Sequence, residues 1–335
     1  MKLYGSIAVH VKGEEILRTP RFWDKFKRAF GAKPDLRTGH LRASIEATAI
    51  VEAVRDALRK IGIHNAISLV IDDTILFHDR EGKPDDLGDL FLAFHDNSSV
   101  FGDGFDELRL AVEHREVGLH MVIELQARSE HPRDRPAIRI VLSGRIEALT
   151  PRPGEDAEAY RKRAEPIATD PRAIEVYRLQ FATFVDQVRD AISGALPNAR
   201  VEVERAEPRI VRPDEKAVEP RAQNPDDRGY DPFLYYYPNP LAYAADALMW
   251  GALFSMAAQP HYVVVDHANH VQGFADDPGI LRGPTSSVDS SPVDTATDSW
   301  WGSDEAGDHG DQGDTGWWDS LGSDESGGDF GGGDF

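Results

Sequence analysis

The chain contains no cysteine among its 335 residues. This absence excludes disulfide frameworks, thiol catalysis, and zinc or iron–sulfur sites built from cysteine ligands. It also fits a reducing compartment. The first residues alternate apolar and polar side chains, whereas a secretory signal would have an unbroken apolar run. We therefore expect a cytoplasmic protein.

Common nucleotide-binding and hydrolase signatures are missing as well. The sequence has no G-x-x-x-x-G-K-[ST] loop, no G-x-G-x-x-G after a predicted strand, no G-x-S-x-G and no H-E-x-x-H. These absences lower the expectation of an enzyme but do not exclude one. Since no pattern in the sequence implies a cofactor, we expect none.

Positive charge is scarce, and it is absent from the C-terminal segment. The formal net charge is -21, from 37 Lys and Arg residues against 58 Asp and Glu residues. Residues 283–335 hold thirteen of these acidic residues and no Lys or Arg, which leaves about -8 for the rest. Binding to nucleic acid is disfavoured at this charge, because the phosphate backbone repels an acidic protein.

The hydrophobic pattern up to residue 207 changes repeatedly between the periods of strands and helices. It predicts strands over 3–11, 66–71 (with an extension through Phe77 left open), 108–112, 119–125, 138–146 and 200–205. Apolar residues at three-to-four spacing predict helices over 20–30, 41–61 and 171–192. This order favours an α+β fold, in which the helices pack on one face of a mostly antiparallel sheet.

We divide the chain into four parts. An α+β domain covers residues 1–207, and a linker rich in proline and charged residues covers 208–228. Residues 229–273 form an aromatic and apolar docking module, and residues 274–335 form an acidic tail. The tail cannot bury enough apolar surface to offset its ordering entropy, so we expect it to be disordered.

The tail nevertheless carries bulky aromatic residues that a spacer would not need. Two Trp-Trp pairs each precede a Gly-Ser-Asp-Glu unit, and two Asp-Phe pairs follow them. We expect the aromatic side chains to anchor in apolar pockets of a protein partner, while carboxylates steer onto a basic rim. The predicted partner-binding residues are Trp300, Trp301, Trp317, Trp318, Phe330, Asp334 and Phe335.

The end of the tail resembles the C-terminal tails of bacterial and phage single-stranded DNA-binding proteins. The resemblance covers about fifty acidic, glycine-rich residues and the terminal pair Asp334-Phe335. In that family the terminal Phe and its carboxylate seat in a basic pocket of a partner protein, which implies recruitment of partners here. DNA binding does not follow, because the predicted helices at 41–61 and 171–192 do not fit an OB-type barrel.

Basic and aromatic residues interleave in the predicted helix at 20–30. One interpretation is an anion-binding surface formed by Arg21, Lys25, Lys27 and Arg28. The alternative is that the aromatic face packs on the sheet and the charges are solvated, which is the usual arrangement of an amphipathic helix. The same surface could receive the acidic tail of this chain, so intramolecular docking is a further hypothesis.

Two other segments suggest alternative functions. The acidic region 72–106 could supply oxygen ligands to a divalent metal in an enzyme, with Asp72, Asp103 and Asp106 as candidates, although its spacing matches no EF-hand. The apolar segment 241–258 could anchor the protein to a membrane, but it is short and contains Asp246. We favour a helix docked on protein, and a non-enzymatic interaction protein overall.

Overall fold

The computed structural model describes most of the predicted α+β domain and parts of the docking module. The described ranges are 1–12, 39–79, 104–129, 135–152, 154–213, 229–237, 242–255 and 262–277, together with positions 24, 27, 87, 90, 93 and 280. All of them belong to the first of two compact units, Met1–Ser290, and the second unit is Ser291–Phe335. The predicted helix at 20–30, apart from Asp24 and Lys27, and the tryptophans of the tail lie outside these ranges.

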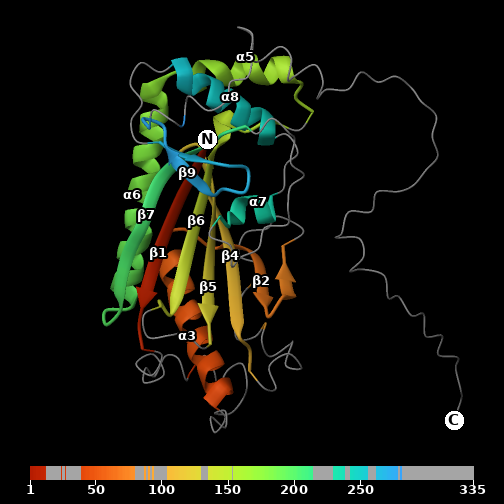
Figure 1. The fold of residues 1–335 in the computed structure, drawn as a ribbon. Helices are drawn as coiled ribbons and strands as arrows, with labels where there is room; N and C mark the ends of the chain where they lie inside the picture. Colours follow the sequence, from red (N-terminus) through yellow and green to blue (C-terminus); the bar gives the residue numbers. More distant parts are fainter. Residues whose placement is uncertain are drawn as a thin grey trace, which may run out of the picture. The chain divides into compact units, whose positions relative to one another are not determined.

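The described strands form one sheet in the order β3-β2-β4-β5-β6-β1-β7-β8-β9 (Figure 1). Seven of the eight pairings are antiparallel, and β7 with β8 is parallel. The predicted α+β class is therefore confirmed. The strands are β1 (Lys2–His10), β2 (Asn65–Ile71), β3 (Thr74–His78), β4 (Glu107–Glu116), β5 (Leu119–Arg128), β6 (Ile138–Ile146), β7 (Arg200–Val211), β8 (Val263–Val265) and β9 (Val271–Phe274).

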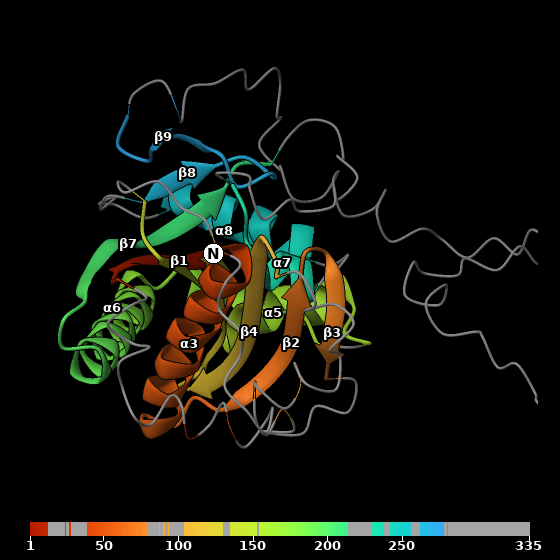
Figure 2. The ribbon, with the colours of Figure 1, turned by 90° about the horizontal axis from the view of Figure 1, so that it is seen from below.

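Two long helices cover one face of this sheet. Helix α3 (Gly39–Lys60) packs on β4, β5 and β6, helix α6 (Pro171–Ala195) packs on β6, β1 and β7, and the two helices contact each other (Figure 2). Helix α6 begins where the sequence predicts it. The side chain of Asp170 accepts a hydrogen bond from the backbone N–H of Arg172, and Pro171 occupies the first turn.

The remaining helices lie elsewhere on the sheet. The short helix α7 (Pro232–Tyr236) contacts β5 and β6 on the face opposite to α3, so the helices do not all share one face. Helices α5 (Ala157–Ala168) and α8 (Ala242–Ser255) contact each other at the end of the sheet where β1 begins (Figure 1). A 3-10 turn (Glu147–Leu149) connects β6 to the loop before α5.

Strand β5 shows why both faces of the central sheet are buried. Leu119, Met121 and Ile123 alternate along the strand and join the core under the helices. Val122, between them, packs against α7 in a separate apolar cluster, and Glu124 is fully buried on that same second face. Alternation thus places the apolar side chains under α3 and α6, and it places charged side chains on the other face.

The structure extends two of the predicted elements. Residues 66–77 form two strands, because Asp72 and Asp73 adopt φ values of 44° and 65° and reverse the chain between β2 and β3. Left-handed φ at both central positions is characteristic of a two-residue hairpin turn. Strand β7 continues to Val211, past the predicted boundary at 207, and pairs with β8 of the predicted docking module. One sheet therefore runs through both parts.

The packing of α6 generates a first prediction. Ile192 is fully buried against the sheet, whereas Leu179 on the same helix is 51% exposed. Replacing Ile192 by Ala should lower the free energy of unfolding by about 2–5 kcal/mol, because it leaves a cavity. The matched change Leu179→Ala should cost less than about 0.5 kcal/mol. Urea unfolding followed by circular dichroism measures both, and equal losses would contradict the described orientation of α6.

Candidate functional site

The most distinctive site in the described structure is where residues 229–237, hereafter the aromatic strap, cross the second face of the sheet. The strap holds α7, and the sequence Asp231-Pro232 starts that helix. The side chain of Asp231 caps it by accepting a hydrogen bond from the backbone N–H of Phe233, with Pro232 in the first turn. Three carboxylates then join the strap to the strands: Glu124, Asp231 and Glu113.

Glu124 is the first of these carboxylates and is fully buried on β5. The hydroxyls of Tyr230 and Tyr236 both donate to its Oε2 at 2.7 Å, and Gln126 donates to its Oε1 at 2.8 Å. Burial, together with the Glu124 charge, raises the pKa of both tyrosines far above its ordinary value. Both hydroxyls therefore stay protonated and serve as donors, which a buried carboxylate requires.

Asp231 is the second carboxylate, and it belongs to the strap itself. Its oxygens accept hydrogen bonds from Ser143 Oγ at 2.5 Å and from Arg145 Nη2 at 2.7 Å, while Lys2 Nζ lies 3.7 Å away. Burial alone would raise the pKa of this carboxyl. The positive charges of Arg145 and Lys2 outweigh burial and hold the pKa well below its usual range. Asp231 is thus ionised inside the protein.

Glu113 on β4 is the third carboxylate, and it binds the end of the strap. It contacts His120 Nε2 at 3.0 Å and Asn65 Nδ2 at 3.0 Å, and it accepts a hydrogen bond from the hydroxyl of Tyr237. The hydrogen bond with His120 is the main reason why the pKa of Glu113 falls to about 2, against the opposing effect of burial. The ring of His120 also meets Phe233 edge-on, with ring centroids 4.9 Å apart.

Asp231 and Glu113 lie against a row of basic residues that crosses five adjacent strands in register, which we call the basic row. The pairings of β7 with β1, β1 with β6, β6 with β5 and β5 with β4 align its members side by side. Asp231 of the strap lies between two members of this row, Lys2 and Arg145. The basic row consists of Arg209, Lys2, Arg145, His120 and Arg115.

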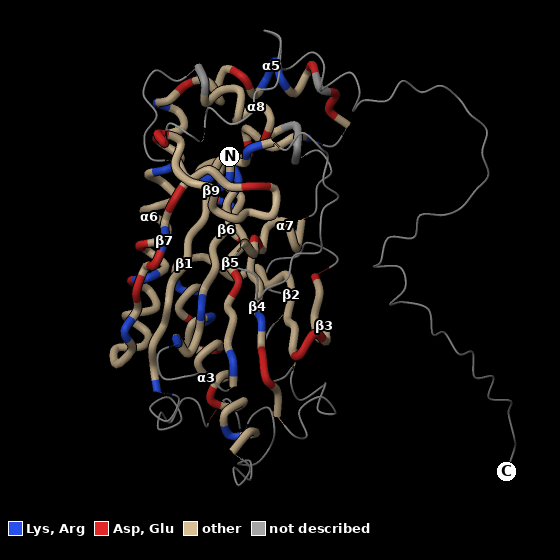
Figure 3. Tube along the Cα trace, in the orientation of Figure 1, with Lys and Arg blue, Asp and Glu red and all other residues tan. Residues whose placement is uncertain are grey.

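A small cavity of about 50 Å³ lies beside the basic row, between the sheet, the strap and α8. Lys2 and Arg145 line it from the strands, and Asp246 lines it from α8. Asp246 is the only charged residue of α8, whereas α5 carries charges of both signs (Figure 3). The rest of the lining is mainly apolar: Met1, Ile146, Leu149, Thr150, Pro151, Phe233, Leu234, Tyr237 and Ala245.

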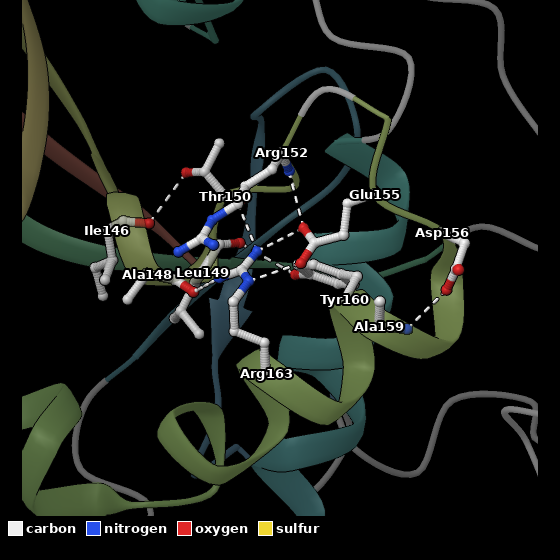
Figure 4. Close-up of polar contacts among 10 residues, drawn as sticks. All are labelled: Ile146, Ala148, Leu149, Thr150, Arg152, Glu155, Asp156, Ala159, Tyr160 and Arg163. Carbon is white, nitrogen blue, oxygen red and sulfur yellow. Dashed lines mark hydrogen bonds and ion pairs between the residues drawn. The ribbon is translucent and has the colours of Figure 1, made fainter.

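The wall of this cavity at residues 146–151 is held by Arg163 of α5 (Figure 4). Its guanidinium donates to the carbonyl oxygens of Ala148 and Thr150 and forms a two-point ion pair with Glu155, with distances of 2.7 Å. The hydroxyl of Tyr160 donates to the carbonyl oxygen of Leu149 at 3.1 Å. The loop after β6 is therefore fixed by charge-assisted hydrogen bonds, which are stronger than neutral ones.

Comparison with known proteins assigns no family to this site. No family model, no curated protein and no solved structure matches the chain.

Most residues that the sequence singled out for binding lie outside the described ranges. This holds for the predicted partner-binding residues from Trp300 to Phe335, and for Arg21, Lys25 and Arg28 of the predicted anion-binding helix. Lys27 is described, as an exposed helical position. The roles of these residues in partner binding, anion binding and intramolecular docking remain predictions.

Two of the three candidate metal ligands are close together, and the structure shows what they do. Asp72 Oδ1 accepts hydrogen bonds from the backbone N–H groups of Asp106 and Glu107, at 2.9 and 2.8 Å, and so joins the β2–β3 turn to the start of β4. Asp103 lies outside the described ranges. Within those ranges, no three His, Asp or Glu side chains gather in a way that could hold a metal ion.

Helix α8 corresponds to the apolar segment predicted at 241–258. It packs on α5 and β7, and it buries Met249, Ala252 and Leu253. Among the described helices, none combines the length and apolar character needed to cross a membrane. The described residues of α8 thus pack on this chain, and membrane association stays an untested alternative.

The tyrosine hydroxyls of the strap generate a second prediction. Tyr230→Phe and Tyr236→Phe should each lower the free energy of unfolding by about 1 kcal/mol, because Glu124 keeps the other donor. The double variant should lose about 0.5–3 kcal/mol more than the sum, since the buried Oε2 then has neither hydroxyl. Chemical unfolding of the original chain, the two single variants and the double variant gives the coupling energy between the two tyrosines.

Tyr235→Phe provides the matched control for this cycle. Tyr235 belongs to the same strap, but its hydroxyl makes no hydrogen bond in the described part of the chain, and its ring lies 5.7 Å from the Arg109 guanidinium. Its change in the free energy of unfolding should stay below about 0.5 kcal/mol. Additive losses in the double variant would show that Glu124 does not join the two tyrosines.

The lowered pKa of Glu113 generates a third prediction, on pH dependence. A carboxyl whose pKa falls from 4.5 in the unfolded chain to about 2 in the folded protein stabilises the fold above pH 4.5. This contribution, roughly 2–3 kcal/mol, should disappear as the pH falls from about 5 towards 2. Glu113→Gln should therefore be less stable than the original chain at pH 7.

Urea unfolding of the two proteins between pH 7 and pH 3 measures this difference directly. Other acidic groups change the stability of both proteins alike, so the difference between the two curves isolates Glu113. The free energies of unfolding of the two proteins should approach each other as the pH falls below 4.5. A difference that stayed constant with pH would contradict an ionised Glu113 in contact with His120.

Proposed function

We propose that this protein is a non-enzymatic, cytoplasmic interaction protein that recruits a protein partner through its acidic C-terminal tail. The observation that carries the proposal is the duplicated unit of two tryptophans and Gly-Ser-Asp-Glu, followed by Asp-Phe at 329–330 and again at the C-terminus. Two copies of one short unit on one segment permit simultaneous contacts, and linked contacts bind far more tightly than each contact alone. The tail is proposed to be disordered until it binds.

The strap supports the proposal by showing how an acidic and aromatic segment is bound within this chain. The carboxylate of Asp231 meets Arg145 and Lys2, and the ring of Phe233 lies 4.6 Å from the Arg145 guanidinium. Asp-Phe pairs of the tail offer the same two groups, a carboxylate and a phenyl ring. The partner surface we expect accordingly has an Arg or Lys beside an apolar slot.

The folded unit serves as the platform in this proposal. In the described structure, Glu124, Asp231 and Glu113 are all engaged by donors from the strap and the strands. Hydrogen bonds to buried carboxylates rigidify a fold. A rigid folded unit of this kind suits a protein that recruits its partner through an attached tail. The charged residues of this face thus act in docking the strap.

The fourth prediction tests recruitment with the full chain and a chain ending at Ser290. This end point keeps Ile280, whose side chain lies against Gly273 of β9, within the folded unit. Affinity purification followed by quantitative mass spectrometry should recover partners with the full chain that the shorter chain loses. Recovery of the same partners by both chains would overturn the proposal.

Point variants in the full chain separate specific anchoring from a general effect of acidic charge. Trp300→Ala with Trp301→Ala, and Trp317→Ala with Trp318→Ala, should each reduce recovery, and the four changes together should lower affinity by about 100-fold or more. Ser299→Ala and Ser320→Ala are the matched controls, since each serine lies within two residues of a tryptophan pair and outside the Gly-Ser-Asp-Glu units. These serine changes preserve the charge and all aromatic residues, and they should leave recovery unchanged.

A further inference from the structure

The ammonium group of Lys2 has an ion-pair partner but no hydrogen-bond acceptor in the described structure. Its side chain is 5% exposed, and the Asp231 oxygen nearest to it lies 3.7 Å away, beyond hydrogen-bonding distance. The two oxygens of Asp231 already accept hydrogen bonds from Ser143 and Arg145. An ammonium has three N–H donors, so an acceptor beside Lys2, from water or from a ligand, would complete its hydrogen bonding.

The place for that acceptor is the cavity beside the basic row, which Lys2 lines. A volume of about 50 Å³ accommodates roughly four water-sized groups, because one buried water needs about 10–15 Å³. Leu149, Phe233 and Ala245 contribute apolar walls. Such a space suits a molecule of about four or five non-hydrogen atoms with a polar group at the Lys2 side and a short carbon segment.

The charged side chains around the cavity limit which ligands it can bind. Lys2 and Arg145 are positive, and Asp231 and Asp246 are negative, so the four side chains balance. Burial lowers the pKa of Lys2, and the carboxylates of Asp231 and Asp246 oppose this effect. A carboxylate ligand would add to that opposing effect and supply charge-assisted acceptors, and a donor elsewhere on the ligand would satisfy Asp246.

We propose that this cavity is a binding site for a short carboxylate that also carries a hydroxyl or amino group. The ligand carboxylate accepts hydrogen bonds from Lys2 Nζ, and the hydroxyl or amino group donates to Asp246. Glycolate and glycine have the required size and groups. This site is independent of the tail, and the proposal does not rest on partner recruitment.

A ligand in this position would connect three parts of the fold. The cavity is bounded by β1 and β6 through Lys2 and Arg145, by the strap through Phe233, and by α8 through Asp246. Binding would therefore add contacts between the sheet and residues 229–255, and the bound protein should resist thermal unfolding more than the free protein.

The fifth prediction uses the full chain with four probes: glycine, glycolate, acetate and methylammonium. Isothermal titration calorimetry and thermal unfolding should show binding of glycine or glycolate, with an affinity about tenfold or more above those of acetate and methylammonium. Acetate lacks the donor for Asp246, and methylammonium lacks the carboxylate for Lys2. Absence of binding by both glycine and glycolate, up to tens of millimolar, would overturn the proposal and leave water as the acceptor.

Variants test the assigned contacts in the same assays. Lys2→Met should reduce the affinity for the bound probe by about tenfold or more, and Asp246→Asn should remove the preference over acetate. Ala245→Leu fills the cavity without changing its charge and should abolish binding, which keeps the test valid if Lys2→Met does not fold. Lys60→Met, at an exposed position at the end of α3, is the control and should bind normally. Normal binding by Ala245→Leu would overturn the assignment to this cavity.

Discussion

The ion cluster around Asp231 is the interaction on which the second face of the sheet depends. One buried carboxylate caps α7, accepts hydrogen bonds from Ser143 and Arg145, and faces Lys2 at the start of β1. A buried ion pair offsets its desolvation only when its geometry and hydrogen bonds are complete. The path of the strap, the position of α7 and the cavity between strap and α8 all depend on the contacts of Asp231 with Ser143, Arg145 and Lys2.

The two faces of the sheet have different physical roles. Under α3 and α6 the buried side chains are mainly aliphatic or aromatic, and burial of this apolar surface is the main source of stability. On the other face, Glu124, Asp231 and Glu113 each accept a hydrogen bond from a specific hydroxyl or guanidinium partner. Directional hydrogen bonds of this kind determine where the strap lies, which apolar contact alone would leave open.

The spacing of apolar residues in the sequence predicted the helices and strands that bury a strong apolar stripe. It did not predict the parts of the structure that polar contacts hold in place. Helix α6 was predictable from its stripe and its Asp-Pro start, as were β4, β5 and β6 from their alternation. Helix α5 was missed because it has few large apolar residues and contains Pro166, and it depends on Arg163 contacts with the backbone of residues 148–150. The strap lies within the segment 229–273 that the sequence predicts to be a docking module. Its binding residues were not predicted, because Lys2, Glu124 and Arg145 come together only through strand register.

Strand β1 lies in the middle of the sheet, although it is the first segment of the chain. Its two neighbours are β6 and β7, so Lys2 pairs with Arg145 on one side and with Arg209 on the other. During synthesis on a ribosome, this first strand must wait until a long stretch of the chain has emerged before either neighbour can pair with it. Pairings between residues so distant in sequence form slowly, since the closure of a long loop precedes them. The central strand is therefore an unpaired edge for much of translation, when a nascent chain is most exposed to aggregation and to chaperones.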